Sequence, residues 1–183
     1  NMINDVLDLT RMGTGHLALH KERIRLSDII ESGVATTRPL IDKKRLRLEV
    51  RVPQDLPEVY CDDTRIQQVI LNLLSNATRF TDEGRITIEV VRQDQQVRVG
   101  VSDTGTGISP EDAEKIFQPF EQGRLWRGKG SSGLGLSISK RFVELHGGEM
   151  WLESELGVGT TFYFTVPISP PMPPVAKPGH AIN

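Results

Sequence analysis

The sequence predicts a two-layer α/β sandwich, an α+β arrangement in which a mixed, largely antiparallel sheet carries its helices on one face. Two observations favour this fold class: segments of period-2 hydrophobicity follow one another in pairs, and amphipathic helices lie between them without a strict βαβ alternation. The 183 residues fit one domain with a small appendage, and a chain of this length buries a core without disulfides. If the loops gather at one end of the sandwich, we expect a single pocket there.

The first part of the chain predicts two helices and a strand. Residues 1 to about 12 carry apolar side chains at helical spacing, but so short a helix needs a partner for its apolar face. A second helix is predicted from a cap at Ser27 to about Ile41. Residues 46–50 alternate apolar and charged side chains, which is typical of a half-buried strand. The expected buried positions of the second helix are Ile29, Ile30, Val34 and Leu40.

The clearest helix begins at a cap on Asp62 or Asp63. Its apolar residues recur at i, i+3, i+4, i+7, i+8 and i+11, which gives a complete buried face. That face consists of Ile66, Val69, Ile70, Leu73, Leu74 and Ala77. A polar stripe follows another side of the same helix and consists of Gln68, Asn72, Asn76 and Arg79.

The second half of the chain predicts two strand pairs and two helices. Residues 86–90 and 97–101 alternate as a hairpin, and residues 149–154 and 160–166 form the last pair. Ser109 followed by Pro110 is a strong helix start. A further amphipathic helix is predicted from Leu134 to His146. Beyond residue 167 the proline content favours a disordered tail or linker.

Composition narrows the class of protein. A net charge of −2 and a pI near 6.1 give no electrostatic reason to expect a nucleic-acid partner. The single cysteine, Cys61, fits a reducing compartment and is expected to be a small buried hydrophobe. No apolar run reaches the length that spans a bilayer. Because the chain begins with Asn, we expect it to be part of a longer protein.

Three features of the sequence suggest chemistry, although each also has a plain structural interpretation. The loop SDTGTGI follows a strand, where Asp103, Gly105 and Gly107 form either a tight turn or a close approach to a ligand. Asn72 and Asn76 lie one helical turn apart and are either surface amides or oxygen ligands of a hard cation such as Mg²⁺. The glycines before the helix at Leu134 either punctuate a loop or leave N–H groups for an anion.

Four segments in this order resemble the N, G1, F and G2 boxes of sensor histidine kinases: NLLSNATRFT, DTGTGI, IFQPFEQ and GSSGLGLSISKRFVELHGGEMWLES. These kinases belong to the ATP-binding superfamily of gyrase, MutL-type repair proteins and 90-kDa heat-shock chaperones. The resemblance implies a Bergerat-type fold and three parts of the chain. Residues 1–19 would be the stump of a dimerisation helix with its linker, 20–167 the catalytic ATP-binding domain, and 168–183 the tail.

The resemblance also implies a role for individual residues. Asp103 would accept a hydrogen bond from the adenine amine, with Gly105 and Gly107 making room for the base. Asn76, assisted by Asn72, would ligate Mg²⁺. Arg79, where the family usually has Lys, would neutralise phosphate charge. The helix start at Gly133 and Gly135 would hold the triphosphate, under a lid formed by residues 121–132. The resemblance completes the nucleotide-binding set with Ile108, Phe117, Phe120, Lys129, Ser132, Leu134 and Leu136. Without the resemblance, Phe117 and Phe120 would be interpreted as core aromatics.

The activity implied is transfer of the ATP γ-phosphoryl group to a histidine on a phosphoacceptor domain, as in a two-component pathway. None of His16, His20, His146 and His180 is followed by the Glu or Asp that the acceptor requires. The implied partners are the phosphoacceptor and dimerisation domain and a response regulator, but not nucleic acid. We expect this fragment to be monomeric and cytoplasmic, and the parent to be a homodimer, either soluble or anchored in a membrane.

Two alternatives remain open. A short basic lid and Arg79 would also suit a degenerate nucleotide-sensing or protein-interaction module that keeps the fold. A third possibility is an ATPase or serine kinase of the same superfamily. Such ATPases typically carry a Glu at the position of Asn72, and because an amide cannot act as a general base, Asn72 favours phosphoryl transfer over hydrolysis.

Overall fold

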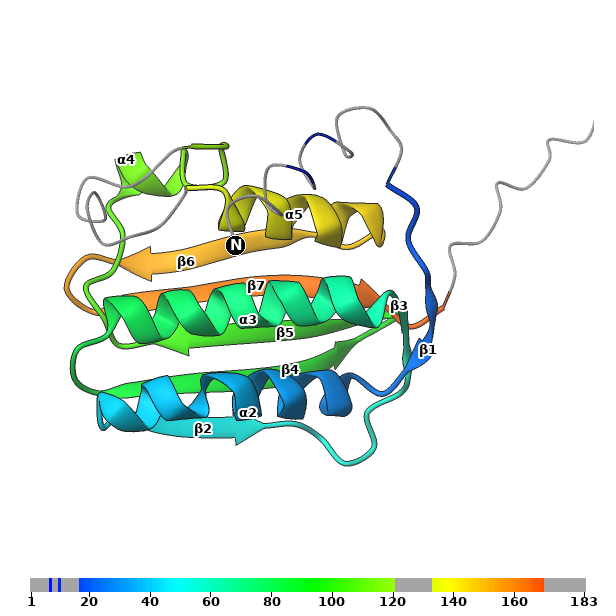
Figure 1. The fold of residues 1–183 in the computed structure, drawn as a ribbon, viewed down its shortest axis with the longest axis horizontal. Helices are drawn as coiled ribbons and strands as arrows, with labels where there is room; N and C mark the ends of the chain where they lie inside the picture. Colours follow the sequence, from blue (N-terminus) through cyan, green and yellow to red (C-terminus); the bar gives the residue numbers. More distant parts are fainter. Residues whose placement is uncertain (1–6, 8–9, 11–16, 121–132, 170–183) are drawn as a thin grey trace, which may run out of the picture.

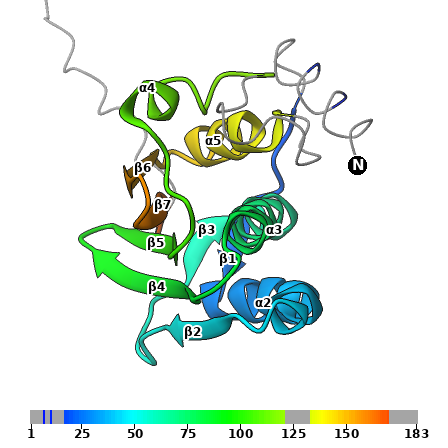
Figure 2. The same ribbon diagram turned by 90° about the vertical axis from the view of Figure 1, so that its left-hand side faces the viewer.

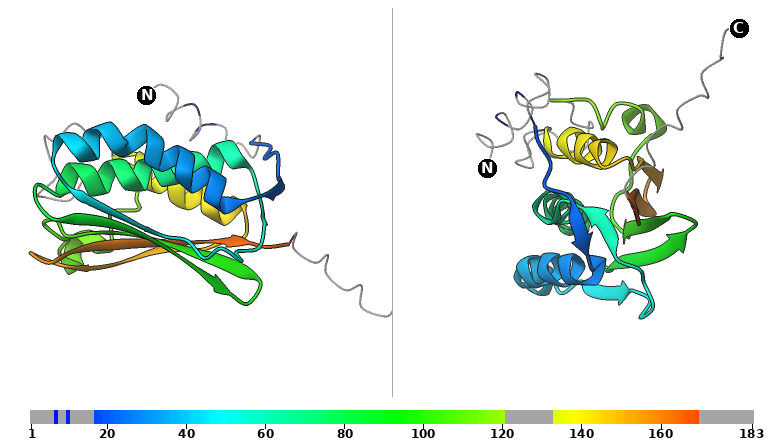
Figure 3. Two further views of the ribbon diagram at one scale, coloured as in Figure 1. Left: turned by 90° about the horizontal axis from the view of Figure 1, so that it is seen from below. Right: turned by 90° about the vertical axis from the view of Figure 1, so that its right-hand side faces the viewer.

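The computed structural model describes Leu7, Thr10 and residues 17–120 and 133–169, which form two layers (Figure 1). One layer is a five-stranded sheet in the order β2-β4-β5-β7-β6, and helices α2, α3 and α5 cover one face of it (Figures 1 and 3). The strands are β2 (Arg47–Arg51), β4 (Arg85–Gln93), β5 (Gln96–Asp103), β6 (Met150–Glu155) and β7 (Gly159–Pro167). Among these five strands, only the β2–β4 pair is parallel. The predicted fold class is confirmed.

The core lies between the sheet and the helices. Every second residue of β5, namely Val97, Val99 and Val101, is buried, as the period-2 pattern predicts. Val99 of β5 lies opposite Phe164 of the neighbouring antiparallel strand β7, and Phe164 is fully buried. Burial of such side chains provides most of the stabilisation of a two-layer domain.

Helix α3 (Asp63–Phe80) is the central helix of the covering layer (Figure 2). It begins as predicted: the Asp62 carboxylate accepts a hydrogen bond from the Arg65 N–H at 3.2 Å, and all six expected apolar positions are buried. Helix α2 (Leu26–Lys43) packs beside it. Gly33 permits this close packing, since a Cβ atom there would lie 2.8 Å from Ile70 Cγ2.

Two expectations for α2 are wrong. The helix begins before Ser27, because Arg25 is the N-cap residue and the Asp28 N–H donates to the Arg25 carbonyl at 3.0 Å. Leu40 is 54% exposed rather than buried, because the buried stripe ends on Ile41 and the next residue of a helix points about 100° away. In the strand that follows, Val50 is exposed, since β2 is the edge strand of the sheet.

Two short strands were not anticipated: β1 (Glu22–Ile24) and β3 (Val59–Cys61) form a separate antiparallel pair. The remaining helices agree with expectation. Ser109 caps α4 (Pro110–Ala113), and α5 (Gly135–Leu145) lies within the predicted span. Most of the predicted helix at residues 1–12 and the tail from 170 fall outside the described residues. Within the described ranges, no helix is long and apolar enough to cross a membrane.

Candidate nucleotide-binding site

Asp103 is the last residue of β5 and is 8% exposed. Its carboxylate accepts a hydrogen bond from the Gly105 N–H at 2.8 Å. Burial raises the pKa of Asp103 from 3.8 to about 6, because a desolvated carboxylate loses the water that stabilises its charge. Hydrogen bonds from the backbone of Gly105 and Thr160 lower the pKa of Asp103, but by less than burial raises it. Asp103 is therefore a buried acceptor with capacity for a further donor.

Thr81 follows the last residue of α3 and is fully buried. Its hydroxyl makes no hydrogen bond of good geometry with the described residues, yet it lies close enough to the Asp103 carboxyl to lower its pKa. No pattern in the sequence indicated Thr81 or Thr160 as a site residue, although Thr81 is the last residue of the first of the four matched segments. An unsatisfied buried hydroxyl is rare and points to a place where a ligand or water completes the bonding.

The glycines after Asp103 allow the loop to pack closely. A Cβ atom on Gly105 would lie 2.9 Å from the Phe80 carbonyl carbon at the end of α3. Gly107 has φ +68°, and a Cβ there would lie 2.7 Å from the carbonyl carbon of Glu155. Close packing within the protein thus explains both glycines, in addition to the contact with adenine that the resemblance implies.

Asn72 and Gly135, which were predicted to act at one site, lie against each other. The Asn72 side-chain amide donates to Ser139 Oγ of α5 at 3.0 Å. A Cβ atom on Gly135 would lie 3.0 Å from Asn72 Cγ, so that only glycine fits beside this amide. The polar stripe of α3 and the glycine-rich start of α5 therefore form one surface.

Asn76 and Arg79 continue this surface toward the end of α3, and both are half-buried. The Asn76 side chain makes no hydrogen bond, and the Arg79 side chain no ion pair, with any residue that the structure describes. No group of three His, Cys, Asp or Glu side chains arranged to hold a metal occurs in the described part of the chain. A cation here would depend on amide oxygens, water and the ligand itself.

The start of α5 is anchored by apolar side chains. Leu134 and Leu136 are buried in the core and hold the first turn of α5 in place. Gly133 has φ +70°, and its carbonyl accepts a hydrogen bond from the Phe120 N–H at 3.0 Å. Lys129, Ser132 and the expected lid at 121–132 lie outside the described residues.

The apolar members of the expected set have different environments. Phe117 packs edge-on against Phe162 at 6.2 Å, in agreement with a core position, and the Lys140 ammonium lies 4.8 Å from its ring centre. Ile108 is buried, and its N–H donates to Ser154 Oγ at 2.8 Å. Phe120 is 70% exposed with φ +65°, so the core position expected for it is wrong. Its N–H is bonded to the Gly133 carbonyl, and its ring lies outside the core.

The site residues gather at one end of the sandwich. In Figure 1, β5 ends and α5 begins at the left, where α3 also ends, while β1 and β3 lie at the opposite end. The condition set for a pocket, that the loops gather at one end of the sandwich, is thus met by these elements. The end of β5 presents the buried Asp103 carboxylate, and the α3–α5 surface presents the Asn72 and Asn76 amides, the Arg79 guanidinium and the first turn of α5.

Comparison with known proteins places this geometry in a family. Residues 61–170 match the family described as histidine kinase-, DNA gyrase B-, and HSP90-like ATPase. The chain is 37% identical over 169 residues to the adaptive-response sensory kinase SasA of Crocosphaera subtropica, covering 91% of this chain and 44% of the relative. It is also 37% identical over 171 residues to the histidine protein kinase DivJ of Caulobacter vibrioides, covering 92% and 28%. The chain thus spans less than half the length of these relatives.

Solved structures agree. Full-length ShkA, crystallised in complex with AMPPNP, aligns with a TM-score of 0.81 at 30% identity over 90% of this chain and 35% of the other. The nucleotide-free catalytic domain of the histidine kinase ThkA aligns with a TM-score of 0.73 at 33% identity, over 81% of this chain and 95% of that domain. The second match covers nearly the whole of an isolated catalytic domain.

Proposed function

The chain belongs to the family of histidine kinase-, DNA gyrase B- and HSP90-like ATPases, as a histidine kinase ATP-binding domain, and we propose that it transfers the ATP γ-phosphoryl group to a histidine outside this chain. One observation carries this proposal: the Asn72 amide is held against Gly135 and Ser139, which joins the asparagine stripe to the glycine-rich helix start. Such a surface suits a polyphosphate.

Asp103 would select the base. Its carboxylate can accept a hydrogen bond from the exocyclic amine of adenine, whereas the carbonyl oxygen of guanine would face it with a second acceptor. Because the carboxylate is buried, no water could donate hydrogen bonds to the Asp103 and guanine oxygens that would face each other. The Thr81 hydroxyl beside it would serve the same polar edge.

The α3–α5 surface would hold the phosphates. Arg79 would contribute a positive charge, and the first turn of α5 would contribute backbone N–H groups. Asn76, assisted by Asn72, would hold Mg²⁺, which when bound would neutralise phosphate charge. The Asn76 amide has no hydrogen-bond partner among the described residues, which fits a cation that keeps most of its water and phosphate ligands. The expected contacts of Ile108, Phe117, Phe120, Lys129 and Ser132 are part of the same proposal.

The choice between transfer and hydrolysis depends on Asn72. An amide cannot remove a proton from water, and this amide is already engaged with Ser139. Phosphoryl transfer depends mainly on positioning and charge neutralisation, which these residues supply. The partners that follow are a phosphoacceptor and dimerisation domain and a downstream response regulator.

The test is a calorimetric titration with ADP and a non-hydrolysable ATP analogue, with and without Mg²⁺. The unaltered chain should bind both nucleotides and Asp103→Ala should not, while Glu111→Ala, an exposed carboxylate on α4, should behave as the unaltered chain. A second assay supplies the phosphoacceptor domain of the Caulobacter relative in trans and follows labelled phosphohistidine. Tight binding without transfer to any acceptor would favour the nucleotide-sensing module instead.

A further inference from the structure

A second polar cluster lies at the end of the sandwich opposite the nucleotide site, where the chain enters the domain. We call it the junction, and it consists of His20, Lys21, Asp62, Leu145 and His146. The His20 N–H donates to Asp62 Oδ2 at 2.9 Å, and the Lys21 ammonium donates to the Leu145 carbonyl at 2.8 Å. The entering segment is thereby bonded to the start of α3 and to the end of α5.

The two oxygens of the Asp62 carboxylate accept hydrogen bonds from two different parts of the chain. Oδ1 caps α3 by accepting the Arg65 N–H, while Oδ2 holds the entering segment through His20. The side chain is 6% exposed, so water cannot replace either bond at low cost. The cap of α3 and the docking of residues 17–24 therefore share one carboxylate.

His146 joins the two helices at the same place. Its Nε2 accepts the Asp62 N–H at 2.9 Å, and its Nδ1–H donates to the Phe142 carbonyl at 2.7 Å, so both ring nitrogens are satisfied in the neutral form. The ring is 1% exposed. Next to it, the Arg65 guanidinium lies 4.9 Å from the Phe142 ring centre and makes a second contact between α3 and α5.

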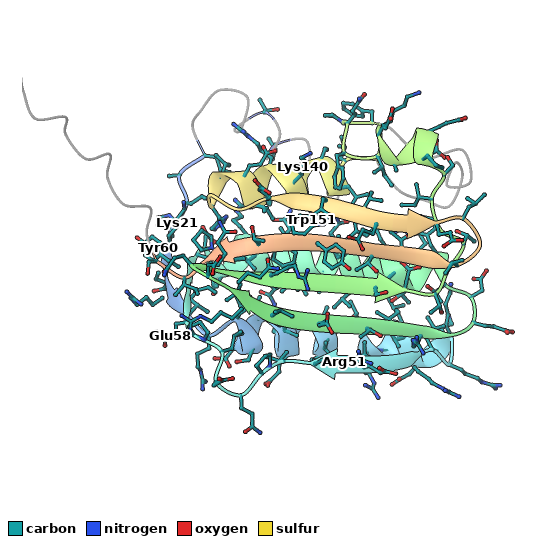
Figure 4. All side chains as sticks on the ribbon, turned by 180° about the vertical axis from the view of Figure 1, so that it is seen from behind. Lys21, Arg51, Glu58, Tyr60, Lys140 and Trp151 are labelled. Atoms are coloured by element: carbon teal, nitrogen blue, oxygen red, sulfur yellow. The ribbon has the colours of Figure 1, made fainter. Side chains whose placement is uncertain are left out.

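The same two helices carry the nucleotide site at their other end. Asp62 pairs with His146, and Asn72 pairs with Ser139, so α3 and α5 run antiparallel and are bonded at both positions. A shift of one helix against the other at the junction must be accommodated at Asn72 and Gly135, where no room exists for even one methyl group. Figure 4 shows Lys21 and Tyr60 at this end of the sheet, away from the nucleotide site.

We propose that docking of residues 17–24 on the junction is thermodynamically coupled to nucleotide binding through the α3–α5 pair. The coupling rests on the proposed function, because it assigns a regulatory input to that site. Its switching element is the β1 strand, which is paired with β3 in this structure and would be detached in the alternative state. By linkage, a nucleotide that binds better to the docked form must strengthen docking by the same factor.

Cys61 is a built-in reporter of this element. It is the only cysteine of the chain, is fully buried, and lies opposite Glu22 in the β1–β3 ladder. Burial raises its pKa to about 12, so the thiolate that reacts with a labelling reagent is suppressed in the folded protein. Because Cys61 pairs directly with Glu22 of β1, we expect detachment of β1 to raise the rate of thiol labelling under native conditions.

The experiment compares Cys61 labelling with and without a saturating non-hydrolysable ATP analogue. Coupling predicts that the analogue slows labelling by about fivefold or more, the size of an ordinary coupling free energy. Global unfolding is measured in a Cys61→Ser, Val99→Cys variant, whose thiol sits on the central strand β5. The slowing at Cys61 should exceed the slowing at this second thiol.

A pair of lysine variants tests the bonds themselves. Lys21→Met removes the bond to Leu145 and should raise the basal labelling rate severalfold, whereas Lys43→Met, an exposed lysine at the end of α2, should leave it unchanged. Equal slowing at both thiols, or nucleotide binding with an unchanged Cys61 rate, would overturn the coupling alone. A chain that binds no nucleotide in the calorimeter would overturn the proposed function as well, and the two failures are thus distinguishable.

Discussion

The Asn72 amide donates to Ser139 Oγ at 3.0 Å, and this bond fixes which way the amide faces. With the nitrogen turned to Ser139, the oxygen lies against Gly135, where a Cβ atom would meet it. A side-chain bond between α3 and α5 thus orients an oxygen at the start of α5. The two residues are 67 positions apart, so the arrangement depends on the packing of two helices.

Gly135→Ala should weaken nucleotide binding by roughly tenfold or more, equivalent to about 1.4 kcal/mol. The new methyl group would displace the Asn72 amide, because Asn72 Cγ lies 3.0 Å from the position it would take. Calorimetry measures the change. Arg141→Ala, on the exposed side of the same helix, should bind as the unaltered chain does, and equal affinities for all three proteins would contradict the role given to Gly135.

The sequence was sufficient for elements whose signal is local. Helix α3 has a complete apolar face and a cap at Asp62, so its start and its buried residues were predicted correctly. The glycine-rich loop after β5 and the asparagine stripe were recognised because their spacing repeats that of a family. These features need no information about distant parts of the chain.

The strands β1 and β3 could not be predicted, because each has three residues and is defined by pairing across 35 positions or more. The same holds for the buried bonds of Asp62 and His146, which join segments 84 positions apart. Thr81 was missed since its significance depends on the nearby Asp103 carboxyl. The exposure of Phe120 follows from a positive φ that no spacing indicates.

Asp103 should make folding stability fall as the pH rises from about 4 to about 6. Its folded pKa of about 6 lies above the ordinary value of 3.8, so the folded state binds the proton more tightly and loses that advantage as the group ionises. A shift of this size corresponds to about 3 kcal/mol. Denaturant unfolding of the unaltered chain and of Asp103→Asn across this range gives the difference curve, and a flat difference would refute the buried, desolvated state of the carboxyl.

His146 should produce the opposite trend. Burial lowers its pKa below 6.5, so the unfolded chain binds the proton more tightly and stability is lost as the pH falls below 6.5. His146→Ala should remove this dependence and should also cost about 1–3 kcal/mol at pH 7.5, because the buried Asp62 N–H loses its acceptor. The variant is compared with Glu144→Ala, an exposed residue of α5. An unchanged slope below pH 6.5 would show that another group titrates there.

Asn76→Ala should abolish the part of nucleotide affinity that depends on Mg²⁺ and leave the Mg²⁺-independent part in place. The side chain is half-buried and makes no hydrogen bond with the described residues, so its removal should change the free energy of unfolding by no more than about 0.5 kcal/mol. Titrations of the ATP analogue with Mg²⁺ and with a chelator separate the two parts, and Gln67→Ala on the same helix serves as a control. If Asn76→Ala kept the full Mg²⁺ effect, the cation would have to be held elsewhere, with Asn72 as the next candidate. If it lost binding under both conditions, Asn76 would instead contact the nucleotide directly.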